Sequence, residues 1–214
     1  MKAGAKILIG LALLAAFGFL FIRSLQTSRS ASYTVEGARL QEWSLALEPA
    51  SSPTAPLLVL RGPMELVSGL FRQVFTRAME SLVNPGTAAI PVVLKGEFDE
   101  SLSGVMTEES LLASARESGL ETAAVEPRCL AHRRISQPGG TRQVYVAVFD
   151  SPGFVRFRQA LAERAGRAGN GGTAFDAAAL SPVMFVAGAD GAFHRWLPLR
   201  VETDADCVAP LERE

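Results

Sequence analysis

The first hydrophobic pattern in the chain is an uninterrupted apolar run near its N-terminal end. Residues 7–22 (ILIGLALLAAFGFLFI) are all apolar or glycine, and basic residues lie on both sides of the run. A helix in a soluble core shows polar residues every three or four positions, and this run has none. At about 1.5 Å per residue, residues 3–22 reach the roughly 30 Å thickness of a bilayer core. We therefore expect residues 1–23 to form a transmembrane signal anchor.

The alternative for this segment is a cleaved signal peptide. Such a peptide usually has an apolar region of about 7–15 residues that ends at small residues. Here the run is longer and ends in Phe21 and Ile22 before Arg23, which favours an uncleaved anchor, whereas Ser30-Ala31-Ser32 keeps cleavage and a secreted or periplasmic product as the alternative. The short basic tail before the run predicts a cytoplasmic N-terminus and an extracytoplasmic location for the residues after 23.

Downstream of the anchor, the polar and small residues 24–32 predict a juxtamembrane linker, and residues 33–214 predict one domain. Alternating or continuous apolar runs predict strands over residues 40–47, 57–60, 90–94, 128–135, 142–149, 183–187 and 192–201. Turn residues at 137–140 and at Asp190-Gly191 predict two hairpins, one joining the fourth and fifth of these strands and one joining the last two.

Three segments have the 3.6-residue period of amphipathic helices. The longest covers residues 64–83, with Phe71 in its apolar stripe, and we expect it to be the main cover of the sheet. Thr107 predicts the N-cap of a second helix, and Ser151 followed by proline predicts the N-cap of a third. The order of elements predicts an α+β fold, in which one mixed or mainly antiparallel sheet is covered by about three helices.

The charge balance argues against nucleic acid as a partner. Beyond residue 30 the chain has 17 basic and 22 acidic side chains, a formal net charge of −5, which gives no electrostatic footprint for nucleic acid. Four arginines gather across the first predicted hairpin: Arg128, Arg133, Arg134 and Arg142. We interpret them as a solvated strand face rather than as an anion site.

The two cysteines, Cys129 and Cys207, both lie in the part of the chain expected outside the cytoplasm, where disulfides persist. We therefore predict a Cys129–Cys207 disulfide. The alternative is that Cys129 is a buried thiol that packs as a small hydrophobe. A catalytic thiol is disfavoured because His132, three residues further along the predicted strand, points to the opposite face.

The weak catalytic candidates are Asp150 and Ser151, which stand at a strand-to-helix turn, with His194 as a hypothetical base. The G-x-S-x-G motif of serine hydrolases is missing, and an N-cap role explains Ser151 more simply.

Metal and cofactor sites are not expected, because the chain has two histidines and no metal-ligand spacing. The glycine-rich residues 166–173 follow a helix and lack the Gly-Lys-Ser/Thr ending of a phosphate loop. The acidic pair Asp204 and Asp206 near the chain end is interpreted as solvated.

The sequence as a whole favours a non-catalytic interaction module of the cell envelope. Residues 7–22 would hold it in the lipid bilayer, and its partner would be another envelope protein. One alternative is an extracytoplasmic hydrolase-like enzyme that uses Asp150, Ser151 and His194. The other alternative is a domain that binds a small ligand.

Overall fold

The computed structural model describes residues 13–20, 23, 31–137, 140–168 and 174–214. The chain divides into two units, Met1–Ala31 and Ser32–Glu214. In the first unit residues 13–20 are helical, and their large apolar side chains are exposed. The remainder of the predicted anchor, linker residues 24–30 and part of the glycine-rich 166–173 segment lie outside the described residues. Within the described ranges, no helix is both long enough and apolar enough to cross a membrane.

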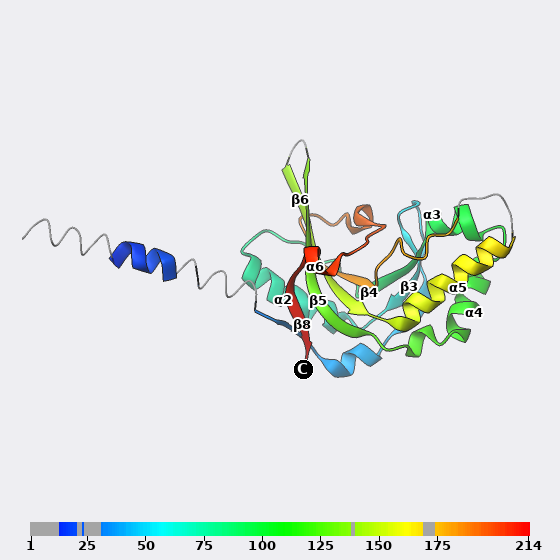
Figure 1. Ribbon diagram of the computed structural model, residues 1–214, viewed down its shortest axis with the longest axis horizontal. Helices are drawn as coiled ribbons and strands as arrows, with labels where there is room; N and C mark the ends of the chain where they lie inside the picture. Colours follow the sequence, from blue (N-terminus) through cyan, green and yellow to red (C-terminus); the bar gives the residue numbers. More distant parts are fainter. Residues whose placement is uncertain (1–12, 21–22, 24–30, 138–139, 169–173) are drawn as a thin grey trace, which may run out of the picture. The chain divides into compact units, whose positions relative to one another are not determined.

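The second unit is an α+β domain with two sheets instead of the single predicted one. The larger sheet is mixed and has the strand order β1-β8-β5-β6-β7, and it curves as a half-barrel (Figure 1). Its strands are β1 (Tyr33–Val35), β5 (Glu126–Gln137), β6 (Gly140–Asp150), β7 (Val183–Gly188) and β8 (Cys207–Arg213). Only β1 and β8 pair in parallel, and the other neighbours are antiparallel.

The smaller sheet is antiparallel, with the order β2-β3-β4. Its strands are β2 (Ser44–Leu47), β3 (Pro56–Arg61) and β4 (Ala89–Leu94). Strand β7 lies between this sheet and the rest of the larger one, and all six of its residues are buried. Burial on both faces explains why the β7 sequence VMFVAG has no polar alternation.

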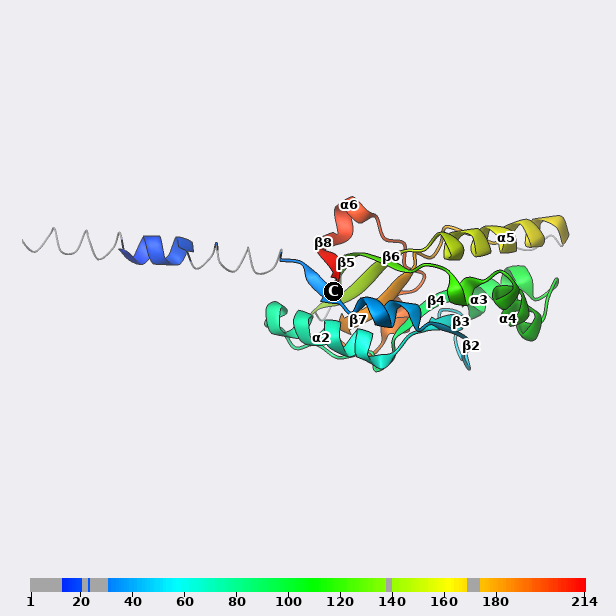
Figure 2. The same cartoon turned by 90° about the horizontal axis from the view of Figure 1, so that it is seen from below.

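The described helices surround these strands. The α-helices are α2 (Met64–Ala78), α3 (Lys95–Glu97), α4 (Glu108–Glu117), α5 (Pro152–Ala168) and α6 (Thr203–Asp206). Short 3-10 turns cover Gly37–Gln41, Leu120–Thr122 and Phe193–Trp196, and a π turn covers Phe98–Leu102. Figure 2 shows α2 and α5 on opposite sides of the strands, so the two longest described helices of the domain do not share a layer.

Two predicted helix starts are confirmed at their caps. The Thr107 hydroxyl accepts a hydrogen bond from the Ser110 backbone N–H at 3.2 Å, and α4 begins at the next residue. The Ser151 hydroxyl accepts one from the Phe154 N–H at 3.5 Å, at the start of α5. These bonds satisfy N–H groups that have no partner inside the first helical turn.

Helix α2 is shorter than predicted, and the side that it buries is narrower than the predicted apolar stripe. It ends at Ala78, and Met79 adopts a left-handed conformation with φ 55°. Its buried residues are Leu66, Val67, Leu70 and Val74, against β1 and β7. Phe71, which the periodicity placed in the core, is only half-buried and stacks on exposed Phe75 with ring centroids 5.7 Å apart.

Two predicted strands are wrong in whole or in part. Residues 37–41 form a 3-10 turn, so only Ser44–Leu47 of the predicted 40–47 strand pairs with a neighbour. Residues 192–201 form no strand, because Phe193–Trp196 is a 3-10 turn and Pro198 lacks the N–H that a ladder needs. The Asp190-Gly191 turn therefore joins β7 to a helical turn. Strands β1 and β8 were missed because β1 has three residues and β8 contains Pro210.

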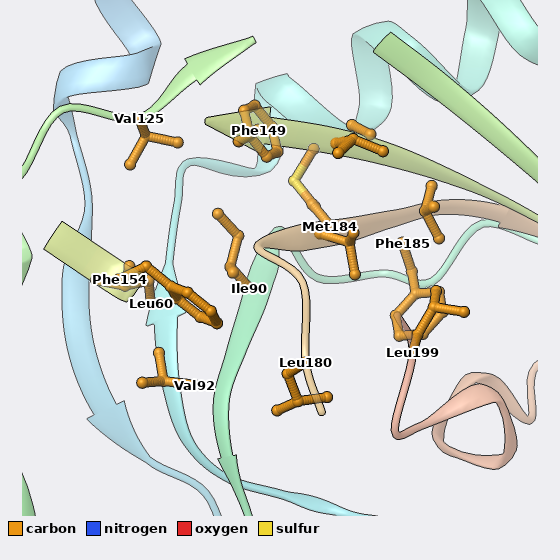
Figure 3. Packing of buried hydrophobic residues seen from close by; sticks show 14 of the residues in the cluster. Leu60, Ile90, Val92, Val125, Phe149, Phe154, Leu180, Met184, Phe185 and Leu199 are labelled. Atoms are coloured by element: carbon orange, nitrogen blue, oxygen red, sulfur yellow. The ribbon is translucent and has the colours of Figure 1, made fainter. Parts of the chain in front are cut away.

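One hydrophobic core connects the two sheets and the helices. Figure 3 shows Phe149 of β6 and Met184 of β7 near Ile90 of β4 and Phe154 of α5. All four side chains are almost fully buried. Close packing of residues from β4, β6, β7 and α5 holds the elements together where no ladder joins them.

Candidate interaction groove

The structure joins Cys129 and Cys207 in a disulfide with Cα atoms 5.8 Å apart. The link connects β5 to the first residue of β8 and leaves no free cysteine in the chain. His132, further along β5, stacks on Tyr145 of β6 with ring centroids 4.2 Å apart.

The structure does not bring the three catalytic candidates together. Ser151 is buried and caps α5, and Asp150 pairs with Arg128 at 3.1 Å. His194 is exposed, in the 3-10 turn after β7, and its neighbour Phe193 packs against Phe185. Among the described residues, no hydrogen bond joins His194 to Asp150 or Ser151.

The four arginines of the β5–β6 hairpin each have an acidic partner. The pairs are Arg128–Asp150 at 3.1 Å, Arg133–Asp206 at 2.6 Å, Arg134–Glu80 at 3.1 Å and Arg142–Asp190 at 2.5 Å. Asp150 belongs to β6 of the same hairpin, and the other three partners come from three segments outside it, so three of the ion pairs attach the hairpin to its surroundings. The cluster is thus structural and is not an open anion site.

Two of these acidic partners, Asp190 and Asp206, are strongly influenced by their surroundings. The Ala192 backbone N–H and then Arg142 hold the pKa of Asp190 below its usual value of 3.8. The Asp206 side chain is largely buried against Arg133, which corrects the expectation of a solvated acidic tail. The side chain of Asp204 lies outside the described residues.

A more extensive polar cluster surrounds Arg158 of α5, whose side chain is 0% exposed. Its guanidinium pairs with Glu97 at 2.7 Å and also donates to the carbonyls of Val92, Asp176 and Ala177. The ring of Phe175 lies 4.7 Å from the guanidinium carbon. All five N–H donors of the arginine have acceptors, so the cluster holds α5 to β4 and has no donor left for a ligand.

A groove of about 660 Å³ lies between residues 40–43 and residues 121–126. The first wall precedes β2, and the second connects the Leu120–Thr122 turn to β5. Arg213 of β8 also lines the groove. Each wall leads into a strand, so the groove lies beside β2, the edge strand of the smaller sheet, and the N-terminal end of β5, an interior strand of the larger sheet.

One wall offers backbone hydrogen-bonding groups. Ala123 is extended, with φ −66° and ψ 140°, and Ala124 is exposed. Within the part of the chain that the structure describes, no hydrogen bond uses the backbone of Ala124 or Val125. Backbone groups without a partner can form hydrogen bonds with an added strand.

The other wall contains Trp43, which is 7% exposed. Its ring packs edge-to-face on Phe149 at 6.0 Å, and its six-membered ring lies against Gly62. The indole Nε1 is buried and has no acceptor among the described residues. A buried donor without a partner costs free energy, so a bound acceptor would stabilise this wall.

Charged groups border the groove without filling it. Glu121 accepts a hydrogen bond from the Leu45 N–H at 2.8 Å, which fixes this carboxylate beside the edge of β2. Arg213 pairs with Glu126 at 3.5 Å, and both side chains are about half exposed. The groove therefore offers backbone groups, an aromatic wall and a polar rim.

Comparison with known proteins identifies no family for this chain, because no protein-family model, curated protein or solved structure matches it. The described residues contain no group of three or more His, Cys, Asp or Glu side chains placed to hold a metal ion.

The sequence interpretation missed this groove. Trp43 lay inside a predicted strand, and residues 121–126 carried no motif. The available signal was the position of both segments immediately before strands, and that position indicates a groove only when the two segments are known to lie side by side.

Proposed function

We propose that this protein is a non-catalytic interaction domain, tethered to the membrane, that binds an extended segment of another envelope protein in the groove. The observation that carries the proposal is the unpaired backbone of Ala124 and Val125 along a groove wall. An extended segment bound beside Ala124 and Val125 would gain main-chain hydrogen bonds, and its side chains would meet Trp43 across the groove. The polar rim would then select among partners.

The location in the proposal has two supports. The Cys129–Cys207 disulfide suggests an extracytoplasmic domain, because disulfides persist in oxidising compartments. The apolar run 7–22 supports a tether with a cytoplasmic N-terminus. Mass spectrometry of protein purified from its native membrane tests both: the expected chain retains residues 7–22 and has no thiol that reacts before reduction. A mature chain that begins near Tyr33 would replace the tether with a cleaved signal peptide.

Peptide binding tests the groove directly. Trp43 is the reporter in a Trp196→Phe background, and the probe is an array of seven-residue peptides of varied sequence. We expect some peptides to change Trp43 emission, because an occupant that reaches Nε1 must shift the indole. Ala124→Tyr should fill the groove and weaken those peptides by about tenfold or more, the cost of losing a well-packed contact and its hydrogen bonds.

Ala178→Tyr is the matched control, because Ala178 is also an exposed alanine but lies outside the groove. This variant should bind the peptides as the wild type does. Peptide affinity that is equal in both variants would contradict the groove assignment. Binding of small organic molecules but of no peptide would favour the small-ligand alternative, which the volume of about 660 Å³ also accommodates.

A further inference from the structure

A second apolar stripe on α2 is covered only in part by the domain. Met64, Phe71 and Phe75 follow one another at intervals of seven and four residues, so they share one side of the helix, and Met79 comes directly after its last residue, Ala78. Met64 is 48% exposed, Phe75 is 50% exposed and Met79 is 79% exposed. The α2 stripe, as we call these four residues, is separate from the side that carries Leu70 and Val74 into the core.

The covalent path of the chain runs beside the C-terminal half of α2. Arg77 donates a hydrogen bond to the Ser32 carbonyl at 3.0 Å, and its guanidinium lies 4.1 Å from the centre of the Tyr33 ring. The Gln73 side chain donates to the Thr34 carbonyl at 2.9 Å and accepts from the Thr34 N–H at 3.0 Å. The first residues of the domain are therefore fixed beside the C-terminal half of α2, the half that also carries Phe75. Figure 2 shows the same proximity of α2 and the first strand.

The length of the tether limits the distance between α2 and the apolar run. Nine residue steps join Arg23 to Ser32, which is about 30 Å of fully extended chain. If residues 7–22 lie in a bilayer, Ser32 and the neighbouring end of α2 remain within that distance of its surface. A tether of this length gives the bilayer a high effective concentration at the α2 stripe.

The charge of α2 permits this contact. The domain is acidic overall, but α2 itself carries Glu65 against Arg72 and Arg77. Its surface is therefore not repelled by anionic lipid headgroups. An amphipathic helix with aromatic and methionine side chains on one side and cations beside them is suited to lie in a membrane interface.

We infer that the α2 stripe docks on the lipid bilayer to which the chain is tethered, with Phe75 and Met79 inserted into the interface. The inference rests on the tether of the proposed function and adds an orientation to it. The domain is held by two contacts, the N-terminal run and α2, rather than moving freely on its linker.

The test uses the full chain reconstituted into vesicles of phosphatidylcholine and phosphatidylglycerol, with and without brominated acyl chains. Phe75→Trp places a fluorophore on the α2 stripe, and Thr76→Trp places one on the adjacent exposed polar side. Emission from Trp43 and Trp196 in the wild-type chain is subtracted. We expect brominated lipid to quench the residue-75 probe at least about twofold more than the residue-76 probe, because a docked helix buries its apolar side about 5–10 Å deep.

The outcomes separate the inference from the proposal on which it rests. A chain that does not float with vesicles overturns the tether and, with it, the docking. A chain that floats while both probes remain unquenched overturns the docking alone. A residue-75 probe that is shielded from aqueous iodide but not quenched by brominated lipid overturns the lipid contact in favour of a protein, such as a second copy, on the α2 stripe. Thermal melts of both variants check that they fold like the wild type.

Discussion

Helices α2 and α5 have similar amphipathic sequences, but each has a residue whose burial is opposite to its polarity. On α5, Arg158 is fully buried among apolar neighbours. On α2, Phe75 leaves half of its surface in solvent. A charge in the core and an aromatic ring at the surface both cost free energy unless a specific partner compensates. The difference lies in what surrounds each helix.

The structure shows which groups compensate for the hydration that Arg158 loses on burial. Glu97 and the carbonyls of Val92, Asp176 and Ala177 replace the water that a guanidinium loses on burial. Among the described residues, the ring contact of Phe75 is with Phe71. We therefore interpret Arg158 as a residue whose partners all lie inside the domain. We interpret the exposed ring of Phe75 as part of a surface that binds a partner outside the domain. Four predictions test this contrast.

The largest effect is expected at Arg158. Arg158→Ala should lower the free energy of unfolding by about 3–5 kcal/mol, because it leaves the Glu97 carboxylate and three carbonyls without their donor. The control is Arg167→Ala on the same helix, where an exposed pair with Glu163 should contribute about 0.5 kcal/mol or less. Urea denaturation of both variants measures the difference. Equal losses would mean that Arg158 is not the structural contact we describe.

The second prediction compares the two apolar sides of α2. Leu70→Ala should cost about 2–5 kcal/mol, because Leu70 is fully buried and its removal leaves a cavity. Phe75→Ala should cost about 1 kcal/mol or less in detergent, since much of the ring is already in solvent. Thermal melts decide between them. A loss at Phe75 as large as that at Leu70 would place the α2 stripe in a core and remove its role as a docking surface.

The third prediction concerns the bond between α2 and β1. Gln73→Ala should cost about 1–2 kcal/mol, because both backbone groups of Thr34 lose their partner on a half-buried strand edge. The adjacent exposed residue supplies the control, and Arg72→Ala should change stability by about 0.5 kcal/mol or less. Hydrogen exchange at Thr34 should accelerate in the Gln73 variant only. Unchanged exchange would show that β1 does not depend on α2.

The smallest effect is expected at the start of α5. Ser151→Ala should cost about 0.5–1 kcal/mol, the low end for an N-cap, because the bond to the Phe154 N–H is long. Thr107→Ala at the start of α4 provides the comparison, with an expected loss of about 1 kcal/mol. Chemical denaturation measures both. If Ser151 instead had a catalytic role, its substitution would abolish an activity while leaving stability nearly unchanged.

Local signals account for what could be predicted about the fold. Capping residues and the 3.6-residue period located α4 and α5, and apolar runs located strands β3, β4, β5, β6 and β7. Strands β1 and β8 escaped because the period of two cannot be recognised in three residues or across a proline. The α+β class was therefore predictable, whereas the division into two sheets was not, since pairing between distant strands leaves no local pattern.

The same distinction applies to the candidate site residues: some of their roles follow from local sequence, and others depend on contacts between distant segments. The sequence placed Cys129 and Cys207 in the part expected to be exported, and it showed that Ser151 suits an N-cap. It could not show that Asp206 pairs with Arg133 or that Arg134 pairs with Glu80, because those partners are tens of residues apart. Hydrophobic periodicity specifies that a helix has an apolar side. Only the tertiary structure decided that α5 buries Arg158 and that α2 exposes Phe75, because burial depends on which distant segments supply atoms to each side.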